Sequence, residues 1–411
     1  MNTLPTALPS TTACVVGGGP AGMMLGLLLA RSGVPVVVLE KHKDFFRDFR
    51  GDTIHPATLE LIHQLGLLPA LLELPHQRVE RGGARVGGID LPIADFTHLP
   101  TQARFIALMP QWDLLNFLAT EAARYPSFRL LMEHQVTGLT QTSGRITGVE
   151  IKTPEGCATL SAALVIGCDG RNATTTLSAH LKVIDTGAPI DVLWFRLTRH
   201  RDDPENVLGI LNYGRMLGLI NRGDYFQCAY IIRKGTFATH IQPSGLEAFQ
   251  AAITQLAPFL TDRIEELTAW DQIKLLTVQV NHLEHWHIPG LLCIGDAAHA
   301  MSPVGGIGIN LAIQDAVATA NLLTEPLLDA ARHGTVITDI TLERVQHRRE
   351  FATRLTQRFQ VFAHGILNRF LGNPAPMRPS WLLRTLAATT LFHRLAGRAI
   401  GMGVLPEKIK T

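Results

Sequence analysis

Three glycines near the start of the chain have the spacing of a phosphate-binding loop. Gly17, Gly19 and Gly22 stand between a short apolar run, residues 14–16, and an apolar segment with helical spacing, residues 23–31. In such a unit the first glycine permits a tight turn, and the second lets the backbone approach a pyrophosphate. The third lets the helix pack closely on the strand. The pattern of strand, glycine loop and helix therefore predicts a dinucleotide site.

The residues around these glycines complete the predicted site. Pro20 and Ala21 open the helix, where free N–H groups and the positive end of the helix dipole face the phosphates. A second apolar run, residues 36–39, ends at Glu40, whose carboxylate can accept hydrogen bonds from a ribose diol. We include the adjacent Lys41 among the expected cofactor contacts. An ordinary glycine-rich turn is the alternative, but it does not require the acid at the end of the second strand.

A second glycine-rich motif follows an apolar strand late in the chain. Residues 291–294 deliver Asp296 to the carboxyl end of a predicted strand, where α/β folds bind ligands. The loop over residues 303–308 then exposes backbone N–H groups at the start of a helix predicted for residues 310–323. Such a helix start can stabilise negative charge, as on the N1/C2=O edge of a reduced flavin. The expected contact residues in this loop are Pro303, Gly305, Gly306, Gly308, Ile309 and Asn310.

Four further residues are candidates for the site, and three of them have an ordinary structural alternative. Arg50 can reach a pyrophosphate bidentately, or it can be a solvated surface arginine. His55 can line a ligand pocket and act as a base, or be a helix-start histidine held by local hydrogen bonds. Asp169, followed by Gly170, either makes a turn or belongs to a second flavin-facing loop. Gln111 opens a predicted helix over residues 111–124.

Composition excludes several classes of protein. The 411 residues are 46% apolar and 18% charged, which is ordinary for an enzyme with a large interior. A net charge of +2 without a basic run argues against nucleic-acid binding. Five scattered cysteines give neither a metal-binding nor a disulfide pattern, so we expect no metal site and a cytoplasmic location. The first dozen residues resemble a loose leader, and no apolar run is long enough for a transmembrane segment.

The order of predicted elements indicates an α/β fold in several parts. A Rossmann-like domain is expected from residues 1–75, 106–188 and 284–330, and residues 331–411 are expected to form a helical C-terminal segment with an apolar helix near 381–395. Residues 76–105 and 189–283 are expected to form an inserted antiparallel-sheet domain that binds substrate. Aromatic side chains concentrate in its strands and can line a ligand cavity or simply form core: Trp194, Phe195, Tyr213, Tyr225, Phe226 and Tyr230. The tail can pack on its own domain, which we favour, or contact a membrane surface or a second subunit.

Taken together, these motifs resemble the single-component FAD-dependent aromatic hydroxylases, the para-hydroxybenzoate hydroxylase family of class A flavoprotein monooxygenases. The resemblance covers most of the chain. It implies that Glu40 holds the adenosine ribose of FAD, that Arg50 and Gln111 contact the cofactor, and that Asp296 lies on the flavin side. It further implies that residues 303–310 surround the isoalloxazine and that the antiparallel sheet covers the substrate.

The implied reaction uses NAD(P)H and O2 to hydroxylate or epoxidise an apolar aromatic or polyketide-like substrate through a C4a-hydroperoxyflavin. One position departs from the family pattern, because Thr176 stands where an arginine usually follows the acid-glycine pair. This departure predicts weak, non-selective use of NADH and NADPH, unless Arg171 takes over the role. A monomer or a homodimer fits the sequence equally well.

Two other classes of function keep the same motifs. A flavoprotein reductase or halogenase has the same fold, but the segment 285–289 lacks the first tryptophan of the halogenase signature. A catalytically idle flavin-binding or sequestration protein is the alternative outside the enzymes.

Overall fold

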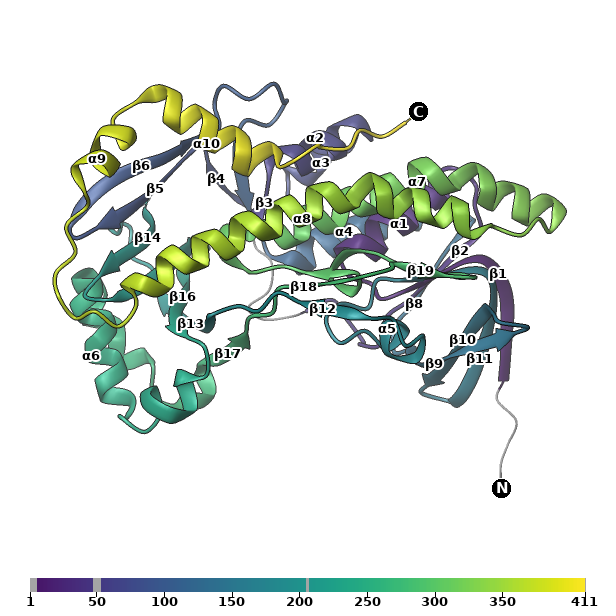
Figure 1. The fold of residues 1–411 in the computed structure, drawn as a ribbon, viewed down its shortest axis with the longest axis horizontal. Coiled ribbons are helices and arrows are strands. Elements are labelled where there is room, and N and C mark those ends of the chain that lie inside the picture. Colours follow the sequence, from purple (N-terminus) through teal and green to yellow (C-terminus); the bar gives the residue numbers. More distant parts are fainter. Residues whose placement is uncertain (1–5, 47–52, 205–206, 411) are drawn as a thin grey trace.

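The computed structural model describes residues 6–46, 53–204 and 207–410, and two large sheets dominate it (Figure 1). The first sheet has eight strands in the described residues, with the order β19-β20-β11-β1-β2-β8 and with β10 and β9 continuing from β11. Strands β8, β2, β1, β11 and β20 are parallel neighbours. The strands of this sheet are β1 (Thr6–Val16), β2 (Val36–Leu39), β8 (Phe128–Leu131), β9 (Gln135–Thr142), β10 (Arg145–Thr153), β11 (Gly156–Gly167), β19 (His287–Ile288) and β20 (Leu291–Cys293).

The start of the chain corrects one expectation. Strand β1 begins at Thr6 and pairs with β11 from Ala158 onward, so residues 6–12 belong to the sheet and are not a loose leader. The apolar run expected as a strand is only the buried end of β1. Its outer half, residues 6–11, is mostly exposed, mixes polar and apolar residues and pairs only with β11, so a search for continuous apolar runs does not detect it.

Helices cover the parallel sheet. Helix α1 packs against both α4 and α7. Its residues 21–30 are all buried, which explains why the sequence is apolar all around the helix rather than on one stripe. Pro20 fits the first helical position because its fixed φ matches the helix and no N–H is needed there. The helices near this sheet are α1 (Pro20–Arg31), α2 (Pro56–Gln64), α3 (Leu68–Leu71), α4 (Gln111–Ala122), α5 (Thr174–Ser178) and α7 (Ile307–His333).

The second large sheet is mainly antiparallel, with seven strands in the order β17-β13-β16-β15-β14-β5-β6. Residues 81–95 cross over from the other half of the chain to supply β5 and β6, and the domain boundaries themselves stay a prediction. Helix α6 (Leu246–Leu256) and the short helices η1 (Phe237–Ile241), η2 (Pro258–Glu266) and η3 (Trp270–Gln272) lie in the segment between β16 and β17. The strands are β5 (Arg81–Val86), β6 (Ile89–Asp95), β13 (Ile190–Thr198), β14 (Val207–Asn212), β15 (Arg215–Asn221), β16 (Tyr225–Arg233) and β17 (Lys274–Thr277).

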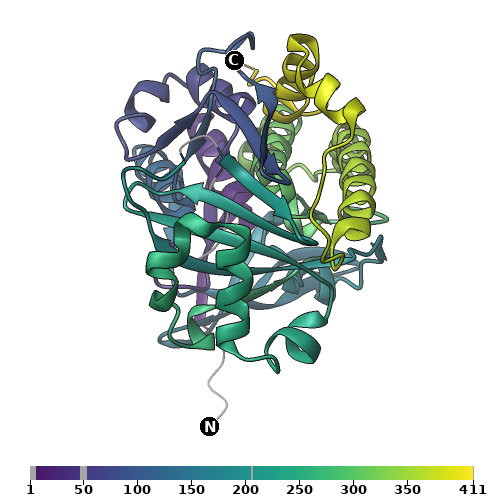
Figure 2. The same cartoon turned by 90° about the vertical axis from the view of Figure 1, so that its left-hand side faces the viewer.

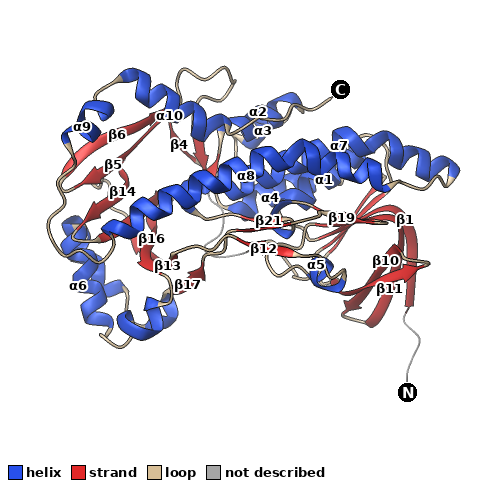
Figure 3. Cartoon of the chain, in the orientation of Figure 1, coloured by secondary structure: helices blue, strands red, loops and turns tan. Residues whose placement is uncertain are grey.

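Two three-stranded sheets lie beside the large ones, as the strands coloured red in Figure 3 show. One contains β3 (Thr53–Ile54), β7 (Ile106–Leu108) and β4 (Gln77–Val79). The other contains β12 (Val183–Asp185), β18 (Asn281–Leu283) and β21 (His299–Ala300). The short helices η4 (Gly295–Ala297) and η5 (Val304–Gly306) flank β21 in the sequence and form the turn and loop of the second glycine-rich motif.

The C-terminal segment is helical, as predicted. Helix α8 (Asp339–Phe370) packs on α7 and runs toward the seven-stranded sheet (Figure 1). The single apolar helix expected near residues 381–395 is instead two helices, α9 (Trp381–Ala387) and α10 (Thr390–Met402). Turns at Ala388 and Thr389, whose N–H groups bond to carbonyls three residues earlier, separate them.

Candidate active site

The carboxyl ends of four parallel strands meet at one edge of the first sheet. Val16 of β1 pairs with Leu39 of β2 and with Gly167 of β11, and Gly167 pairs with Cys293 of β20. The predicted cofactor residues follow directly: the glycine loop after β1, Glu40 after β2, Asp169 after β11 and Asp296 after β20. The fold thus gathers residues that are up to about 280 positions apart in the sequence at the edge where parallel sheets bind ligands.

The loop of residues 17–22, here called the first glycine loop, is held by close main-chain contacts. Gly17 has φ +105°, and a Cβ there would lie 2.5 Å from the carbonyl oxygen of Cys168. A Cβ on Gly22 would lie 2.0 Å from the carbonyl oxygen of Gly17. Gly19 is different, because no atom lies within 4 Å of the position of its Cβ. Two of the glycines close the loop, and the third leaves open space beside the start of α1.

Glu40 is fixed before any ligand binds. Its Oε2 accepts a hydrogen bond of 3.0 Å from the Gly18 N–H, and its Oε1 accepts one of 3.0 Å from the His42 N–H. The side chain is buried, whereas the adjacent Lys41 is exposed. A carboxylate oxygen can accept more than one hydrogen bond. A ribose diol is a donor of the required kind.

Gln111 and Arg50 are the two other predicted contacts with the cofactor. Gln111 is the first residue of α4 and is partly buried, and its neighbour Trp112 lies 4.9 Å from Phe46, centroid to centroid. This contact brings the start of α4 beside the segment that follows β2. Arg50 lies outside the described residues, so its role stays a prediction.

The acid-glycine pair forms a tight turn after β11. Asp169 accepts hydrogen bonds from the Thr175 hydroxyl at 2.6 Å and from the Thr175 N–H at 3.0 Å. Burial raises the pKa of Asp169, although the bonds from Thr175 act in the opposite direction. Gly170 has φ +81°, a conformation that glycine adopts without strain. The turn also touches the first glycine loop, because Gly17 lies against Cys168.

Thr176 faces the interior. Its hydroxyl donates to the carbonyl of Ala297 at 3.2 Å, and only 6% of the residue is exposed. An arginine at this position would therefore be buried, so Thr176→Arg should not improve nicotinamide binding. The arginine side chain that lies near this turn is Arg171. It donates to Asp296 at 3.3 Å and to the Met301 carbonyl at 2.9 Å.

The loop of residues 303–308, here called the second glycine loop, is held by side chains. Gly305 and Gly306 have φ +82° and +62°. A Cβ on Gly306 would lie 1.7 Å from the Thr53 hydroxyl oxygen, so only glycine fits beside β3. Asn310 donates to the carbonyls of Thr53 at 3.0 Å and of Gly306 at 2.9 Å. Its Oδ1 accepts from the His55 N–H and the Thr58 hydroxyl, each at 2.8 Å.

Asn310 is therefore a clamp that joins the second glycine loop to the segment that starts α2. Both of its donor hydrogens and both lone-pair directions of its oxygen are used within the protein. Its expected contact with the cofactor stays a prediction, and its contribution to the loop is visible without a ligand. Asp296 lies close to the same helix start, because its Oδ1 is 3.9 Å from where a Cβ on Gly308 would be.

Helix α8 holds the other side of this loop. Gln360 accepts from the Ser302 N–H at 3.1 Å and donates to the carbonyls of Ser302 at 3.1 Å and Val304 at 3.3 Å. The Ser302 hydroxyl lies 2.8 Å from His364 Nε2, and both side chains are buried. Burial lowers the pKa of His364, so the imidazole is neutral near pH 7. The sequence alone did not predict a role for Ser302, Gln360 or His364.

A buried network of charged side chains supports the turn that carries Asp296. Asp315 of α7 accepts from the Gly295 N–H at 3.0 Å, lies 2.5 Å from His299 Nε2 and pairs with Arg349 at 2.9 Å. Burial acts to raise the pKa of Asp315, but His299 and Arg349 outweigh it and lower the pKa. Arg349 also lies 3.5 Å from Glu407 near the end of the chain. The turn is thus tied to α7, α8 and the C-terminal residues.

His55 is buried behind the second glycine loop. Its Nδ1 lies 2.9 Å from the carbonyl oxygen of Ile400 in α10, and 2% of the residue is exposed. Burial lowers the pKa of His55 to about 4, although the carbonyls of Ile400 and Gly305 act in the opposite direction. The imidazole is therefore neutral near pH 7. Its role as a base stays a prediction, and its contacts join the loop to α10.

The aromatic residues of the second sheet divide between its two faces. Phe195, Phe226 and Tyr230 pack with Phe249 of α6 and form core, so they do not line a cavity next to the second glycine loop. Side chains alternate along a strand, and Trp194 therefore lies on the face opposite to α6. We call this the inner face of the sheet and the α6 side its outer face. There it shares an apolar cluster with Val304 of the second glycine loop.

The inner face also carries buried hydrogen-bond donors. Trp194 Nε1 and Gln227 Nε2 are buried and have no hydrogen-bond partner among the described residues. In the strand register Gly209 pairs with Gly218, Gly218 with Ala229, and Ala229 with Trp194. This row therefore presents only hydrogen atoms and one methyl group beside the indole on this face of the strands. The sequence holds a signal for this row, since each of the three successive strands β14, β15 and β16 has one small residue in its interior. These residues are Gly209, Gly218 and Ala229.

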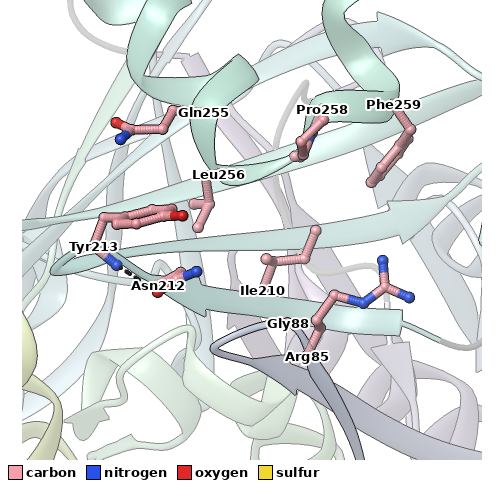
Figure 4. A pocket seen from close by; sticks show the side chains of 10 residues that line it. Arg85, Gly88, Ile210, Asn212, Tyr213, Gln255, Leu256, Pro258 and Phe259 are labelled. Carbon is pink, nitrogen blue, oxygen red and sulfur yellow. Dashed lines mark hydrogen bonds between the residues drawn. The ribbon is translucent and has the colours of Figure 1, made fainter. Parts of the chain in front are cut away.

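A cavity of about 180 Å³ lies on the outer side of the same sheet (Figure 4). Ile210, Tyr213 and Gln255 are among the residues that line it, together with Leu256 and Phe259. Ile210 and Leu256 also belong to the core cluster on the α6 side of the sheet. The cavity is therefore on the opposite face from Trp194 and the second glycine loop.

The residues present fit FAD. The first glycine loop leaves the open space at Gly19 that a pyrophosphate needs, and Glu40 is preoriented for a ribose. The N–H groups at the start of α7 have no partner within the helix and are placed for the flavin end of the cofactor. Among the described residues, no group of histidine, cysteine, aspartate or glutamate side chains could hold a metal ion. In the same part of the chain, no helix is both long enough and apolar enough to cross a membrane.

Comparison with known proteins confirms the resemblance. Residues 10–358 match the family described as "FAD binding domain". The chain is 30% identical over 404 residues to a 6-methylpretetramide 4-monooxygenase of Streptomyces rimosus, covering 94% of this chain and 92% of that protein. It is 26% identical over 321 residues to a dialkyldecalin synthase of Streptomyces rugosporus, covering 75% of this chain and 64% of that protein.

The fold is that of a solved monooxygenase structure. The crystal structure of the p-nitrophenol 4-monooxygenase of Pseudomonas putida superposes with a TM-score of 0.74 at 18% identity, covering 96% of this chain and 95% of that chain. That likeness establishes the α/β fold with its parallel sheet, antiparallel sheet and C-terminal helices. The family itself is shown by the match of residues 10–358, which cover most of the chain. The chain belongs to the FAD-binding flavoprotein monooxygenases, the family of the FAD-dependent aromatic hydroxylases.

Proposed function

We propose that the protein uses NAD(P)H and O2 to hydroxylate or epoxidise a mostly apolar aromatic or polyketide-like molecule. The observation that carries this proposal is the position of the inner sheet face, where Val304 of the second glycine loop packs against the apolar cluster that contains Trp194. A substrate on this face lies next to the expected position of the flavin ring. The names of the relatives agree, because the 6-methylpretetramide 4-monooxygenase is named for oxygenation of a polycyclic molecule.

The inner face suits a flat, weakly polar ligand. The row of Gly209, Gly218 and Ala229 leaves room for a ring system, and apolar side chains of Met216 and Ile220 border it. The unpartnered donors of Trp194 and Gln227 supply the few polar contacts that orient such a ligand. A buried donor without a partner is costly, which favours a ligand oxygen at this place.

Bound FAD supplies the oxygen activation, and the chain supplies position and environment. Glu40 and the first glycine loop hold the adenosine and pyrophosphate end of the cofactor. The N–H groups at the start of α7 stabilise negative charge on the flavin end, as preorganised donors do. Asn310, Gln360 and the Ser302–His364 pair keep these donors in place, and Val304 helps to exclude water.

Oxygen consumption by purified protein tests this proposal. We expect O2 uptake with NADH or NADPH that increases when phenolic or polycyclic aromatic compounds are added, and 18O from O2 in the product. A product formed without O2 uptake would instead indicate cyclisation chemistry, for which the dialkyldecalin synthase is named. FAD binding without any turnover would favour the sequestration alternative.

Two glutamine variants then distinguish the two faces of the sheet. Gln227→Leu removes a donor on the inner face and should raise the KM of the aromatic substrate about two- to tenfold, the effect of one hydrogen bond. Gln255→Leu changes the outer cavity and should leave the KM unchanged. The reverse result would move the substrate to the outer cavity of Figure 4.

A further inference from the structure

Helix α8 is polar on its buried side. Gln346 accepts from the Trp286 N–H at 2.9 Å and donates to the Glu284 carbonyl at 2.9 Å. Farther along, Gln357 donates to the carbonyls of Asn281 at 2.7 Å and Ala300 at 3.2 Å. With Arg349, Gln360 and His364, these residues form a stripe of hydrogen-bonding side chains turned toward the protein. The inward face of α8 is therefore the polar one.

The outward side of the same helix is apolar. Phe359 and Phe362 are each 66% exposed, which is the reverse of the usual arrangement for a helix on a protein surface. At about 100° per residue, the exposed large apolar side chains of this helix fall within about a 120° arc. They are Ile340, Phe351, Leu355, Phe359, Phe362, Ile366 and Phe370.

Helices α9 and α10 also expose apolar side chains. Trp381 is 77% exposed, and Leu382, Leu386, Leu391 and Leu395 are also exposed. Figure 2 shows the three helices, in yellow-green to yellow, along one side of the molecule. We call the exposed apolar residues of α8, α9 and α10 the C-terminal apolar surface. An exposed apolar surface of this size marks an interaction site.

Basic side chains accompany the apolar ones. Arg344 and Arg369 fall in the same arc of α8, and Arg358 borders it. All three are exposed, as are Arg384 and Arg394 in the helices that follow. Residues 339–411 contain twelve Lys and Arg against four Asp and Glu, whereas residues 1–338 contain 25 against 31. The positive charge of the chain is therefore concentrated in the segment that exposes apolar side chains.

We propose that the C-terminal apolar surface binds the anionic surface of a lipid bilayer. Apolar side chains enter the boundary between head groups and acyl chains, and arginines bind the negative head groups. A second copy of the chain fits less well, because the contact would bring two segments of the same strong positive charge together. The helices lie on the bilayer, and the protein reaches apolar molecules that partition into it.

Flotation with lipid vesicles tests the proposal on the complete protein. We expect binding to phosphatidylcholine vesicles that contain about one third phosphatidylglycerol, weak binding to phosphatidylcholine alone, and release by high salt. Neutralising two arginines, as in Arg358→Gln with Arg369→Gln, should weaken binding about 25-fold, since each contributes roughly fivefold near such a surface. Phe359→Ser with Phe362→Ser should reduce it further, while FAD content and melting temperature stay the same.

Matched changes elsewhere serve as controls. Leu177→Ser removes an exposed leucine from α5, and Lys152→Gln removes an exposed charge from β10, both outside the C-terminal helices. Neither should alter vesicle binding. Absence of binding to anionic vesicles would overturn the proposal. So would a concentration-dependent dimer that Phe359→Ser disrupts, because the surface would then be an interface between two copies of the chain.

Discussion

The two glycine loops of the site are built in different ways. In the first loop, main-chain atoms touch each other, and the glycines are required because a Cβ would meet a carbonyl oxygen at 2.5 Å or less. In the second loop, side chains from β3, α7 and α8 hold the main chain through hydrogen bonds. Gly306 alone repeats the steric constraint, since a Cβ there would meet Thr53.

Because of this difference, the two loops are held in place by different sets of residues. Apart from the hydrogen bond between the Gly18 N–H and Glu40, the first loop depends on main-chain contacts among its own residues and with the turn beside Cys168. The second loop needs residues that are about 50 to 250 positions away in the sequence, including Thr53 and Gln360. Changes in the first loop should therefore act by steric conflict, and changes around the second should act by leaving polar groups without partners.

Gly22→Ala should have the largest effect. The new Cβ would lie 2.0 Å from the Gly17 carbonyl oxygen, and neither backbone segment can move without separating α1 from β1. We expect a loss of about 3 kcal/mol in the free energy of unfolding, at the upper end for overpacking, and protein with little bound flavin. Denaturant unfolding and the ratio of visible to ultraviolet absorbance measure the two effects.

Gly19→Ala is the control for this prediction, because the space around Gly19 is open. The stability of the flavin-free protein should not change. If Gly22→Ala were as stable and as yellow as the unaltered protein, the close main-chain contact would not be what closes the first loop.

Asn310→Ala should have the next largest effect. It removes four hydrogen bonds and leaves the buried groups of His55, Thr58, Thr53 and Gly306 without this partner. Since one unsatisfied buried group costs on the order of 1–3 kcal/mol, we expect about 2–3 kcal/mol in total. Asn310→Asp keeps the acceptor oxygen and should lose less. Equal stability of all three proteins would contradict the role of Asn310 as a clamp.

His55 should make the second loop sensitive to acid. The pKa of His55 is lowered from about 6.5 when unfolded to about 4 when folded, so the unfolded chain binds the proton more tightly. Stability from this group is therefore present above about pH 6.5 and is lost as the pH falls to about 4, by about 3 kcal/mol. The difference in unfolding free energy between the unaltered protein and His55→Gln should shrink over this range. A difference that does not change with pH would show that His55 does not titrate as its burial requires.

Arg171→Ala should have the smallest effect on stability. The ion pair with Asp296 is partly exposed, so its loss should cost no more than about 1 kcal/mol. If Arg171 takes the place of the missing family arginine, flavin reduction at low NAD(P)H concentration should slow about tenfold in anaerobic stopped-flow. Thr176→Arg should instead destabilise the fold, since it buries a guanidinium. Unchanged reduction in Arg171→Ala would leave nicotinamide binding to other residues.

The same difference between the loops explains what the sequence could predict. The first loop was predictable because its glycines, helix and acid follow one another within 24 residues and each has a local physical reason. The contacts of Gln360 and His364 were not, because only folding brings α8 beside residues 302–304. A signal was present in the polar residues that repeat at helical spacing in α8. The inner and outer faces of the second sheet could not be told apart, because both carry aromatic residues at alternating positions.

The most direct test of the account is the identity of the ligand that the purified protein retains. The two loops are expected to hold the two ends of one molecule, so denatured protein should release one FAD per chain, identified by mass spectrometry. FMN would show that the first loop does not bind an adenosine end. NAD alone, or no retained dinucleotide and no binding of added FAD, would contradict the assignment of the second loop to a flavin.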